Sequence, residues 1–389
     1  MPTLTLNGRT MKGCISVLAA LLLSIGTSSF AQTNWTPRIS GTTQKLNNVA
    51  FGNGVFVIVG EAGIILSSHD NGITWLARNS GTGYGLLGIT WGNGIFVAVR
   101  DANDATAETT TIFTSPDGIT WSVRNAASAA ALRNLTYDGS QFILVGDKGT
   151  ISTSTNGINW VLRSSGTSQQ LNAVASGNGV LVVVGEVGEI LSSQDNGVTW
   201  QPQTSGTGYG LRGVAYGNGL FVAVRDANDT TLETSTIFTS PDGITWTPRN
   251  SESVRALKTV AFTGIQFLVV GFNGTILASP PGFTWTPQNS GTTQGLNGIA
   301  YGNAHAAAVG DNGTILTIDQ FSTNSIRILP AIELEIATQA GKTYQIQVTT
   351  DLQNWTDYGP TFEGTGEIVF KLVTTRTAEK QYFRTKLFN

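Results

Sequence analysis

Apolar residues along this chain come in short runs that are broken every few positions by Gly, Asn, Asp or Ser. In the first clear unit these runs predict strands at residues 48–51, 55–59, 64–68 and 73–78. Gly52-Asn53-Gly54 separates the first two strands, and Asn and Gly tolerate the positive φ of a two-residue hairpin turn. Runs rich in Val, Ile, Thr, Phe and Trp with such turns between them are typical of β-structure. The pattern predicts an all-β protein.

The same unit recurs along most of the chain and closes each time with a tryptophan. These tryptophans are Trp35, Trp75, Trp121, Trp160, Trp200, Trp246 and Trp285. Their spacings of 40, 46 and 39 residues occur twice in succession, so a period of 125 residues overlies the shorter one. A unit near 40 residues with four short strands is typical of a β-propeller blade, whereas solenoid repeats rarely carry three tight hairpins each. The longer period indicates duplication of a three-blade unit.

Counting strands predicts seven blades, of which the last is incomplete. The seventh unit has three strands, but the residues that follow, 319–325, contain neither a fourth strand pattern nor a closing tryptophan. Residues 34–38, near the N-terminus, form an orphan fourth strand that closely matches residues 284–288. Pairing this strand with residues 314–318 would cover two exposed sheet edges. We therefore expect a seven-bladed β-propeller closed by an N-terminal strand.

The propeller is expected to occupy residues 32–325, because the repeat stops at about residue 326. Beyond it, alternating runs at residues 344–348 and 368–372 predict a small antiparallel β-sandwich over residues 326–389. The all-β fold class thus combines a seven-bladed propeller with a C-terminal β-sandwich.

Residues 1–31 are typical of a secretory signal peptide. Arg9 and Lys12 precede an apolar run at residues 15–25, and small residues favour cleavage just before position 32. The run is too short to span a bilayer comfortably. Cleavage would also remove Cys14, the one cysteine, so we expect no disulfide in the fold. The sequence predicts a secreted or periplasmic protein with no membrane span.

Charge and composition exclude several classes of function. Charged residues make up only 12% of the chain and the formal charge is −3, which is not the basic footprint of a nucleic-acid binder. The two histidines, His69 and His305, have no second His or Cys at metal-ligand spacing. No nucleophile elbow or phosphate-binding loop occurs in the right context. We expect a monomer with no cofactor and no nucleic-acid partner.

The third hairpin of most units carries a recurring motif. Residues 68–75 (SHDNGITW) and 193–200 (SQDNGVTW) have its full form, residues 115–121 and 240–246 are one residue shorter, and Pro281 replaces Asp in the last copy. These segments resemble the Asp-box (BNR-type) repeats of propeller proteins. The resemblance implies a structural role, in which the carboxylate or amide accepts turn N–H groups, Gly supplies an unusual φ and Trp packs between sheets. The residues assigned to it are Asp70, Gly72, Trp75, Asp117, Trp121, Asn156, Trp160, Asp195, Gly197, Trp200, Asp242, Trp246 and Trp285.

Two groups of such propellers imply different functions. The Val-Gly-Glu-x-Gly-x-Ile-Leu cadence at residues 59–66 is similar to photosystem II assembly-factor propellers, which are non-catalytic and bind a partner polypeptide. Sialidases share the propeller, but their Arg-Ile-Pro signature is absent; Arg38-Ile39-Ser40 and residues 327–330 are near matches in other contexts. Two carboxylates of another glycosidase would leave no signature, so glycan processing stays open. Residues 344–355 and 381–384 resemble an accessory module of exported bacterial proteins.

The second and fifth blades depart from the repeat in one place. Val-Gly-Glu becomes Val-Arg-Asp, an acidic loop follows, and a Gly-Tyr-Gly segment precedes the blade. In propellers both segments emerge on the face opposite the Asp-box turns, where Arg, Tyr and carboxylates could bind a ligand and the acidic loops could hold Ca²⁺. Equally, a duplicated blade could have copied a surface loop whose charges pair locally. The candidate ligand-binding residues are Tyr84, Arg100, Asp101, Asp104, Tyr209, Arg225, Asp226 and Asp229.

The leading hypothesis is a secreted, non-catalytic binding propeller whose partner is a protein or polysaccharide ligand. The four strands of a unit are lettered A to D in chain order. The ligand would lie on the face formed by the B–C loops within the units and the D–A loops between successive units. An exported glycan-processing enzyme of the sialidase-like class is the alternative, and a purely structural surface protein is a third possibility.

Overall fold

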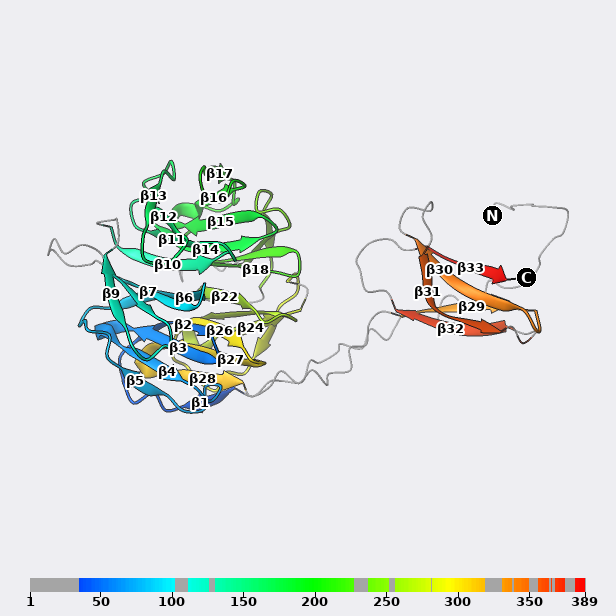
Figure 1. Ribbon diagram of the computed structural model, residues 1–389, viewed down its shortest axis with the longest axis horizontal. Coiled ribbons are helices and arrows are strands. Elements are labelled where there is room, and N and C mark those ends of the chain that lie inside the picture. The colour runs from blue at the N-terminus through cyan, green and yellow to red at the C-terminus, as the bar shows by residue number, and fades with distance from the viewer. Residues whose placement is uncertain are drawn as a thin grey trace. The chain divides into compact units, whose positions relative to one another are not determined.

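The repeated units form seven four-stranded antiparallel sheets in the computed structural model (Figure 1). The chain divides into two units, Met1–Phe321 and Ser322–Asn389, which are described separately. The predicted signal peptide lies outside the described residues, which contain no helix long and apolar enough to cross a bilayer. The structure describes residues 35–388 except 102–110, 126–129, 227–236, 252–255, 281, 319–330, 338, 350–355, 364, 366–367 and 375–381.

Six blades each consist of four consecutive strands, A to D, numbered here as blades 1 to 6. Blade 1 contains β2 (Leu46–Gly52), β3 (Val55–Gly60), β4 (Ile65–Ser68) and β5 (Leu76–Arg78); blade 2 contains β6 (Leu86–Gly92), β7 (Ile95–Arg100), β8 (Thr111–Ser115) and β9 (Ser122–Asn125); blade 3 contains β10 (Leu132–Tyr137), β11 (Phe142–Gly146), β12 (Ile151–Ser154) and β13 (Val161–Arg163). Blade 4 contains β14 (Leu171–Gly177), β15 (Val180–Gly185), β16 (Ile190–Ser193) and β17 (Gln201–Gln203); blade 5 contains β18 (Leu211–Gly217), β19 (Leu220–Arg225), β20 (Ile237–Ser240) and β21 (Thr247–Arg249); blade 6 contains β22 (Leu257–Phe262), β23 (Phe267–Gly271), β24 (Ile276–Ser279) and β25 (Thr286–Gln288). Short 3-10 turns follow four of the B strands: η1 (Glu61–Gly63), η2 (Glu186–Gly188), η3 (Phe272–Gly274) and η4 (Asp311–Gly313).

Blade 7 is completed by the N-terminal strand, as the sequence predicts. It contains β26 (Leu296–Gly302), β27 (His305–Gly310) and β28 (Ile315–Ile318), with β1 (Thr36–Arg38) as the fourth strand. β1 pairs antiparallel with β28, in a register that places Pro37 opposite Leu316. The closed seven-bladed propeller is therefore confirmed, and the two ends of the repeat share one sheet.

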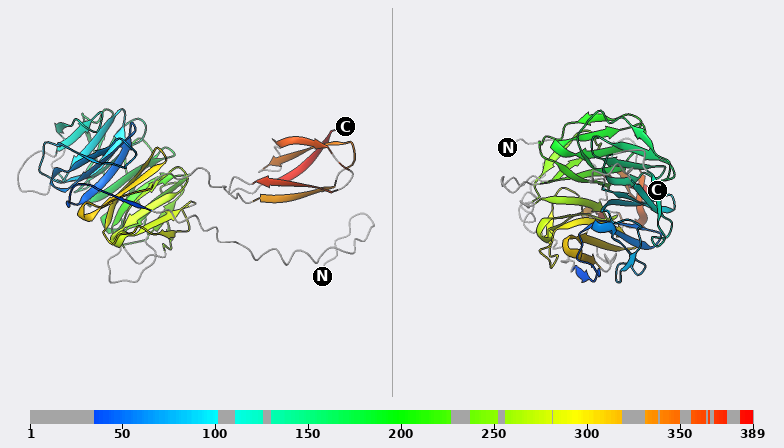
Figure 2. Two further views of the ribbon diagram at one scale, coloured as in Figure 1. Left: turned by 90° about the horizontal axis from the view of Figure 1, so that it is seen from below. Right: turned by 90° about the vertical axis from the view of Figure 1, so that its left-hand side faces the viewer.

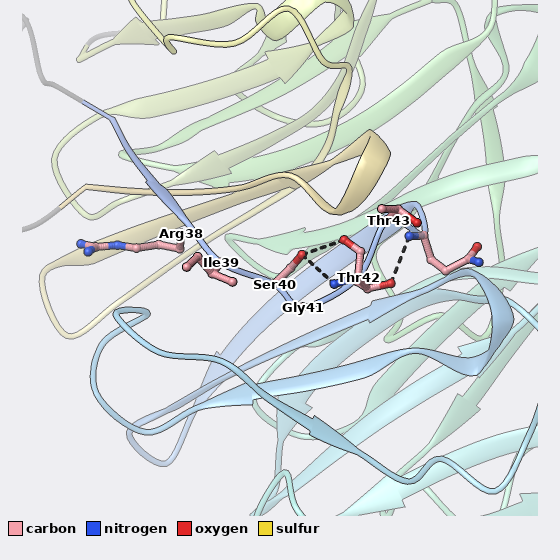
Figure 3. Close-up of a pocket in the computed structure, with 7 residues that line it drawn as sticks. Arg38, Ile39, Ser40, Gly41, Thr42 and Thr43 are labelled. Atoms are coloured by element: carbon pink, nitrogen blue, oxygen red, sulfur yellow. Dashed lines mark hydrogen bonds between the residues drawn. The ribbon is translucent and has the colours of Figure 1, made fainter.

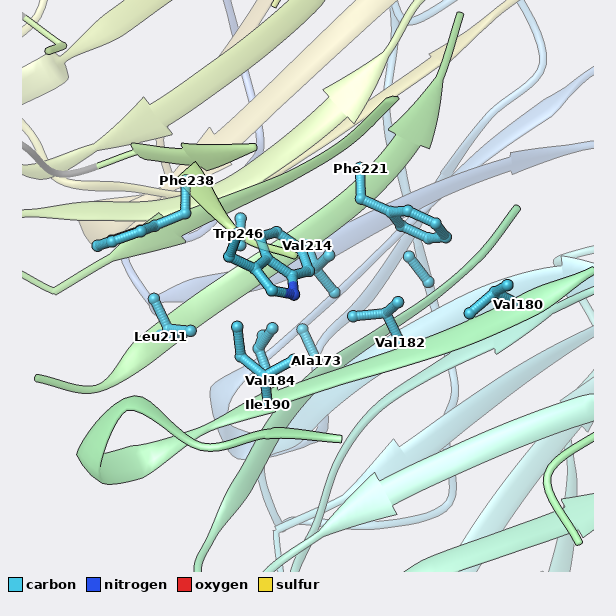
Figure 4. Close-up of a cluster of buried hydrophobic side chains, with 12 residues drawn as sticks. Ala173, Val180, Val182, Val184, Ile190, Leu211, Val214, Phe221, Phe238 and Trp246 are labelled. Carbon is cyan, nitrogen blue, oxygen red and sulfur yellow. The ribbon is translucent and has the colours of Figure 1, made fainter. Parts of the chain in front are cut away.

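The core lies between the blades. Seven clusters of buried hydrophobic side chains are found among the described residues, one between each pair of adjacent blades. Between blades 4 and 5, Val182 and Phe221 are fully buried and Trp246 is almost so (Figure 4). Full burial of one such side chain contributes about 1.5–3 kcal/mol. The ring is thus held by sheet-on-sheet packing, and the closing tryptophan of each unit is part of it.

Each Gly-Asn-Gly segment forms a hairpin turn and also provides a glycine on which an aromatic ring of the next blade packs. Asn53 and Gly54 have φ of 49° and 77° and form the hairpin turn between β2 and β3, while Gly52 is paired within the ladder. A Cβ on Gly52 would lie 2.0 Å from Cγ of Trp91, because that ring packs flat on the Gly52 backbone. The expected strand D at residues 73–78 is shorter than predicted, because residues 73–75 belong to the preceding turn.

The C-terminal unit contains two small antiparallel sheets. β29 (Ala331–Ala337) pairs with β32 (Ile368–Thr374), and β30 (Thr343–Thr349) lies between β31 (Thr356–Glu363) and β33 (Tyr382–Phe388). Both alternating runs singled out in the sequence lie in these strands. Tyr344 is buried and stacks on Phe362 with ring centroids 5.7 Å apart.

Candidate functional site

The turns between strands C and D, which carry the recurring motif, are closed by hydrogen bonds within the motif. In blade 1, Ser68 Oγ donates to Asp70 Oδ1 (2.7 Å) and accepts from the Gly72 N–H (2.8 Å). Asp70 Oδ1 also accepts the Thr74 N–H (2.9 Å), and the Trp75 indole N–H donates to Gly72 O (2.9 Å). Gly72 itself has φ of 88°. The aspartate therefore organises a turn and the tryptophan anchors it in the core.

The side-chain bonds of the turn recur in other copies, and the indole bond recurs for Trp160, Trp200 and Trp246. Amide or carboxylate oxygens of Asp117, Asn156, Asp195 and Asp242 accept N–H groups of their own turns. Bonds from Thr199, first from its hydroxyl and then from its N–H, lower the pKa of Asp195 to about 2. Backbone bonds from Thr120 and Thr245 likewise lower the pKa of Asp117 and Asp242. Pro281, the departure from the motif in blade 6, lies outside the described residues.

These turns share a face with the A–B hairpins. Asn303 of the blade 7 hairpin donates to Asn71 Oδ1 of the blade 1 motif (2.7 Å), and Asn93 of blade 2 donates to Thr155 O of blade 3 (3.1 Å). The turns thus also tie neighbouring blades together.

On the opposite face, two rings of side chains surround the centre of the propeller. The outer ring consists of the first residue after each strand B. The N–H of this residue donates to the carbonyl oxygen of the residue just before strand A. The inner ring is the second residue of each strand A. We call the two rings the collar. Its outer members are Glu61, Asp101, Asp147, Glu186, Asp226, Phe272 and Asp311, and its inner members are Asn47, Leu87, Arg133, Asn172, Arg212, Lys258 and Asn297.

Asparagines in blades 1, 4 and 7 bridge to the next blade. The Asn172 amide donates to Leu211 O of blade 5 (2.8 Å) and to Glu186 Oε1 of its own blade (3.3 Å). Asn47 and Asn297 make the equivalent pairs of bonds. Three of the seven inner collar residues therefore link neighbouring blades.

Arg212 in blade 5 links two carboxylates. Its guanidinium lies 2.8 Å from Glu186 Oε1 of blade 4 and 2.8 Å from Asp226 Oδ2 of blade 5. In blade 3, Arg133 pairs with Asp147 of its own blade. These groups are about a quarter to a third exposed, so solvent weakens the attraction.

Lys258 in blade 6 has a different environment. The collar position that holds a carboxylate in every other blade is Phe272 here, and Lys258 Nζ lies 4.3 Å from the Phe272 ring centroid. Burial lowers the pKa of Lys258; Asp226 opposes this shift, and Arg212 adds to it. Lys258 is thus the one collar cation whose own blade offers an aromatic ring in place of an acid.

The predicted ligand-binding residues fall into two matching stacks. The Arg100 guanidinium carbon lies 4.1 Å from the Tyr84 ring centroid, and that of Arg225 lies 4.5 Å from the Tyr209 ring centroid. Both arginines are only 3% exposed, whereas Tyr84 is 38% exposed. The tyrosine faces therefore cover the arginines, and any ligand on this face would meet the tyrosines first.

The carboxylates of these two blades are only partly described. Asp101 and Asp226 are collar members, and Asp226 pairs with Arg212. Asp104 and Asp229, with the acidic loops that could hold Ca²⁺, lie outside the described residues. Within the described part of the chain, no group of three or more His, Cys, Asp or Glu side chains could hold a metal ion.

Sequence reasoning missed Arg212, Glu186, Lys258 and Phe272. Aligning the second residue of strand A and the first residue after strand B across the seven units would have revealed them, since Lys258 and Phe272 break the pattern of the other blades.

Two surface hollows lie near other D–A loops. One is lined by residues 38–44, where Ser40 Oγ accepts the Thr42 N–H (3.3 Å) and donates to Thr42 O (3.0 Å) (Figure 3). The other lies over residues 187–190 and 202–207. Both are open hollows whose polar groups largely bond within the loop, so the collar remains the better candidate.

The seven-bladed ring, seen from a second direction in Figure 2, is similar to several solved propellers. YCF48 bound to D1 peptide is 16% identical with a TM-score of 0.59, over 75% of this chain and 99% of that one. YCF48 from Cyanidioschyzon merolae is 16% identical with a TM-score of 0.58, over 73% and 98%. Virginiamycin B lyase from Staphylococcus aureus, in a catalytically inactive form with quinupristin, is 11% identical with a TM-score of 0.61, over 74% and 99%. No protein-family model and no curated protein matches the sequence. At these identities the likeness shows the fold: this chain carries a seven-bladed β-propeller.

Proposed function

We propose that this protein is an exported, non-catalytic binding propeller that holds an extended polypeptide on its collar face. The observation that carries the proposal is the break in the collar at blade 6, where Lys258 meets Phe272 while the other six turn positions carry carboxylates. Lys258 gives blade 6 an ammonium suited to an acidic group of a ligand, since it is a charge-assisted donor, whereas Arg212 is paired with Glu186 and Asp226. The related fold of YCF48, solved with a D1 peptide, supports a peptide ligand over a small molecule.

The two tyrosine–arginine stacks supply the second half of the proposed site. Tyr84 and Tyr209 offer flat apolar faces with polar tips, and the arginines beneath hold each ring by a cation–π contact. Arg100 and Arg225 then act as positioning residues, with Asp101 and Asp226 next to them in the chain; Asp104 and Asp229 lie outside the described residues. A polysaccharide is the other ligand that such faces suit.

Peptide and glycan arrays probed with the labelled propeller would test the proposal. We expect peptides with acidic residues to bind, and Lys258→Ala to weaken the best of them about tenfold by removing a charged hydrogen bond. His69→Ala, on the opposite face, is the control and should bind normally. Binding that withstands Lys258→Ala and Tyr84→Ala/Tyr209→Ala together would show that the collar face is not the site.

A lyase among the similar folds keeps a catalytic function as the second candidate. Neither histidine, however, lies at the collar: His69 is in the blade 1 motif and His305 begins β27. Mass spectrometry of an array-identified glycan or peptide after incubation with the protein distinguishes binding from catalysis. A product that forms with the wild-type protein but not with Lys258→Ala would make the protein an enzyme.

Export is part of the same proposal and rests on residues 1–31. Expression of the full chain in a bacterial host should give mature protein beginning near residue 32 in the periplasm or medium, as read by N-terminal sequencing. A chain retained in the cytoplasm with its first residues intact would contradict it.

A further inference from the structure

The outer strands of the blades differ in one residue that controls strand pairing. Each D strand is the edge of its sheet, and its middle residue lies opposite the middle of strand C. In four consecutive blades, 4 to 7, this residue is proline: Pro202, Pro248, Pro287 and Pro37. Blades 1 to 3 have Ala77, Val123 and Leu162 instead.

The prolines show which way this N–H points. Residues in an antiparallel edge strand alternate between bonding the neighbouring strand and facing away from it. Proline has no N–H, so it is tolerated in an edge strand where the N–H would face solvent. The registers place Leu162 and Pro202 equivalently. The N–H of Leu162, like those of Ala77 and Val123, is therefore directed away from its own sheet.

The same three strands expose apolar side chains. Leu76 is 58% exposed, Val123 52%, Val161 53% and Leu162 59%, whereas the D strands of blades 4 to 7 carry Thr, Gln, Pro and Arg. Natural edge strands are usually protected by proline or charge against pairing with other chains. Blades 4 to 7 have this protection, and blades 1 to 3 lack the proline.

Each of these strands also presents an arginine. The Nε–H groups of Arg78, Arg124 and Arg163 donate to Ser67, Thr114 and Thr153 of strand C, at 2.7, 3.3 and 3.0 Å. No carboxylate among the described residues forms an ion pair with any of the three. The outer rim of blades 1 to 3 thus combines outward N–H groups, exposed aliphatic side chains and cations.

We propose that this rim is a second interaction surface, separate from the collar, on which an extended segment of a partner protein adds a strand to β13. Val161 and Leu162 make β13 the most apolar of the three edges, and Arg163 would pair with an acidic residue of the segment. Strand addition takes affinity from main-chain bonds and specificity from alternating side chains. Val161 and Arg163 lie on one face of the strand and Leu162 on the other, so the segment places apolar residues opposite Val161 and Leu162 and an acidic residue opposite Arg163. A second copy of this chain fits less well, because its own rim arginines would face these.

The chain contains its own test sequence. Val161→Thr/Leu162→Pro changes β13 from Val-Leu-Arg to Thr-Pro-Arg, which is the sequence of β1 and β21, so the fold should be kept. The probe is a short fluorescein-labelled peptide with a central Glu flanked on each side by two Val residues, titrated by fluorescence polarisation. We expect binding to the wild-type protein and about tenfold weaker binding to the variant, because one main-chain bond and two apolar contacts are lost. The reverse change in blade 6, Thr286→Val/Pro287→Leu/Gln288→Arg, should strengthen binding.

Matched controls separate the possible outcomes. A probe with Lys in place of Glu, and one with N-methylated backbone, should both bind weakly; equal binding of either would overturn the charge pairing or the strand addition. Equal binding of wild type and variant, or no binding to wild type, overturns the proposal, as does a preference for anionic phospholipid vesicles or for self-association in sedimentation. Because the proposed collar site also favours acidic peptides, the two rim sequences are compared in the Lys258→Ala background, so that the rim is tested with the collar contribution reduced and independently of it.

Discussion

The two three-blade units, residues 46–163 and 171–288, share their buried residues and differ at their surfaces. Phe96 and Phe221 occupy equivalent positions and are both fully buried, and Arg100 and Arg225 each stack on a tyrosine. At the collar, however, Leu87 corresponds to Arg212, and Asp147 corresponds to Phe272. The second unit thereby gains positive charge around the centre of the ring.

At the rim the difference runs the other way. The first unit has aliphatic, proline-free D strands, and the second has a proline in each. Positions between blades are constrained by close packing, since cores are sensitive to changes of a single methylene. The collar and rim are free of that constraint, so their divergence is where the two units could acquire separate partners.

The largest effect on stability is expected when the strand that closes the ring is removed. Deleting residues 32–40 removes β1 and Trp35, which is 6% exposed in the cluster between blades 6 and 7. Loss of a buried tryptophan alone costs about 3–5 kcal/mol, and the lost strand adds to that. Calorimetry should show a cooperative transition at least several degrees lower. Deleting residues 32–34 is the control; a melting temperature unchanged by the longer deletion would mean that β1 does not close the ring.

Glycines of equivalent turns in the two units offer a finer comparison. Gly72 and Gly197 have φ of 88° and 78°, so Val at either position should cost about 1–3 kcal/mol of backbone strain. A Cβ on Gly72 would lie 2.9 Å from Thr317 Cγ2, while one on Gly197 would have 3.3 Å to Leu181 Cδ1. Gly72→Val should therefore be the more destabilising in urea unfolding. The opposite order would show that strain, and not this contact, decides the cost.

The collar comparison predicts a smaller effect. Arg212→Leu installs the residue of blade 2 and leaves Glu186 and Asp226 without their shared cation. Because these groups are partly exposed, we expect a loss of at most about 1 kcal/mol in low salt, and less in high salt. Urea unfolding at two salt concentrations measures it. A loss that is independent of salt would assign the effect to packing of the arginine stem.

The smallest effect at neutral pH is expected in the turns between strands C and D. The pKa of Asp195 is lowered from 3.8 to about 2, so its ionised form stabilises the fold above about pH 4, and this contribution is lost as the pH falls toward 2. Asp195→Asn introduces the residue type that Asn156 supplies in its own turn, and it should change stability little at pH 7 while flattening the acid loss between pH 4 and 2. Melting temperatures across that range test it; parallel curves for the two proteins would exclude a role for this carboxylate.

The repeat made much of the fold predictable. Blade count, hairpins and the pairing of the N-terminal strand follow from tryptophan spacing and the missing fourth strand of the last unit. The burial of Arg100 and Arg225 could not be predicted from the sequence, because it depends on how Tyr84 and Tyr209 fold back over them. The repeat brought out these four residues, but the direction in which a tyrosine of the D–A loop folds leaves no trace in the pattern of apolar and polar positions.

What the sequence by itself determined is the periodic part: seven four-stranded blades, their turns and the tryptophans that close them, because each blade repeats one local pattern of apolar and turn residues. The tertiary structure alone decided which side chains meet at the centre and at the rim. Arg212 reaches a carboxylate of the neighbouring blade only because the ring brings strands of successive blades side by side, and Lys258 lies over Phe272 because β22 pairs with β23 within blade 6. The outward direction of the Leu162 N–H is likewise set by the pairing of β12 with β13, which fixes which backbone groups remain for a partner.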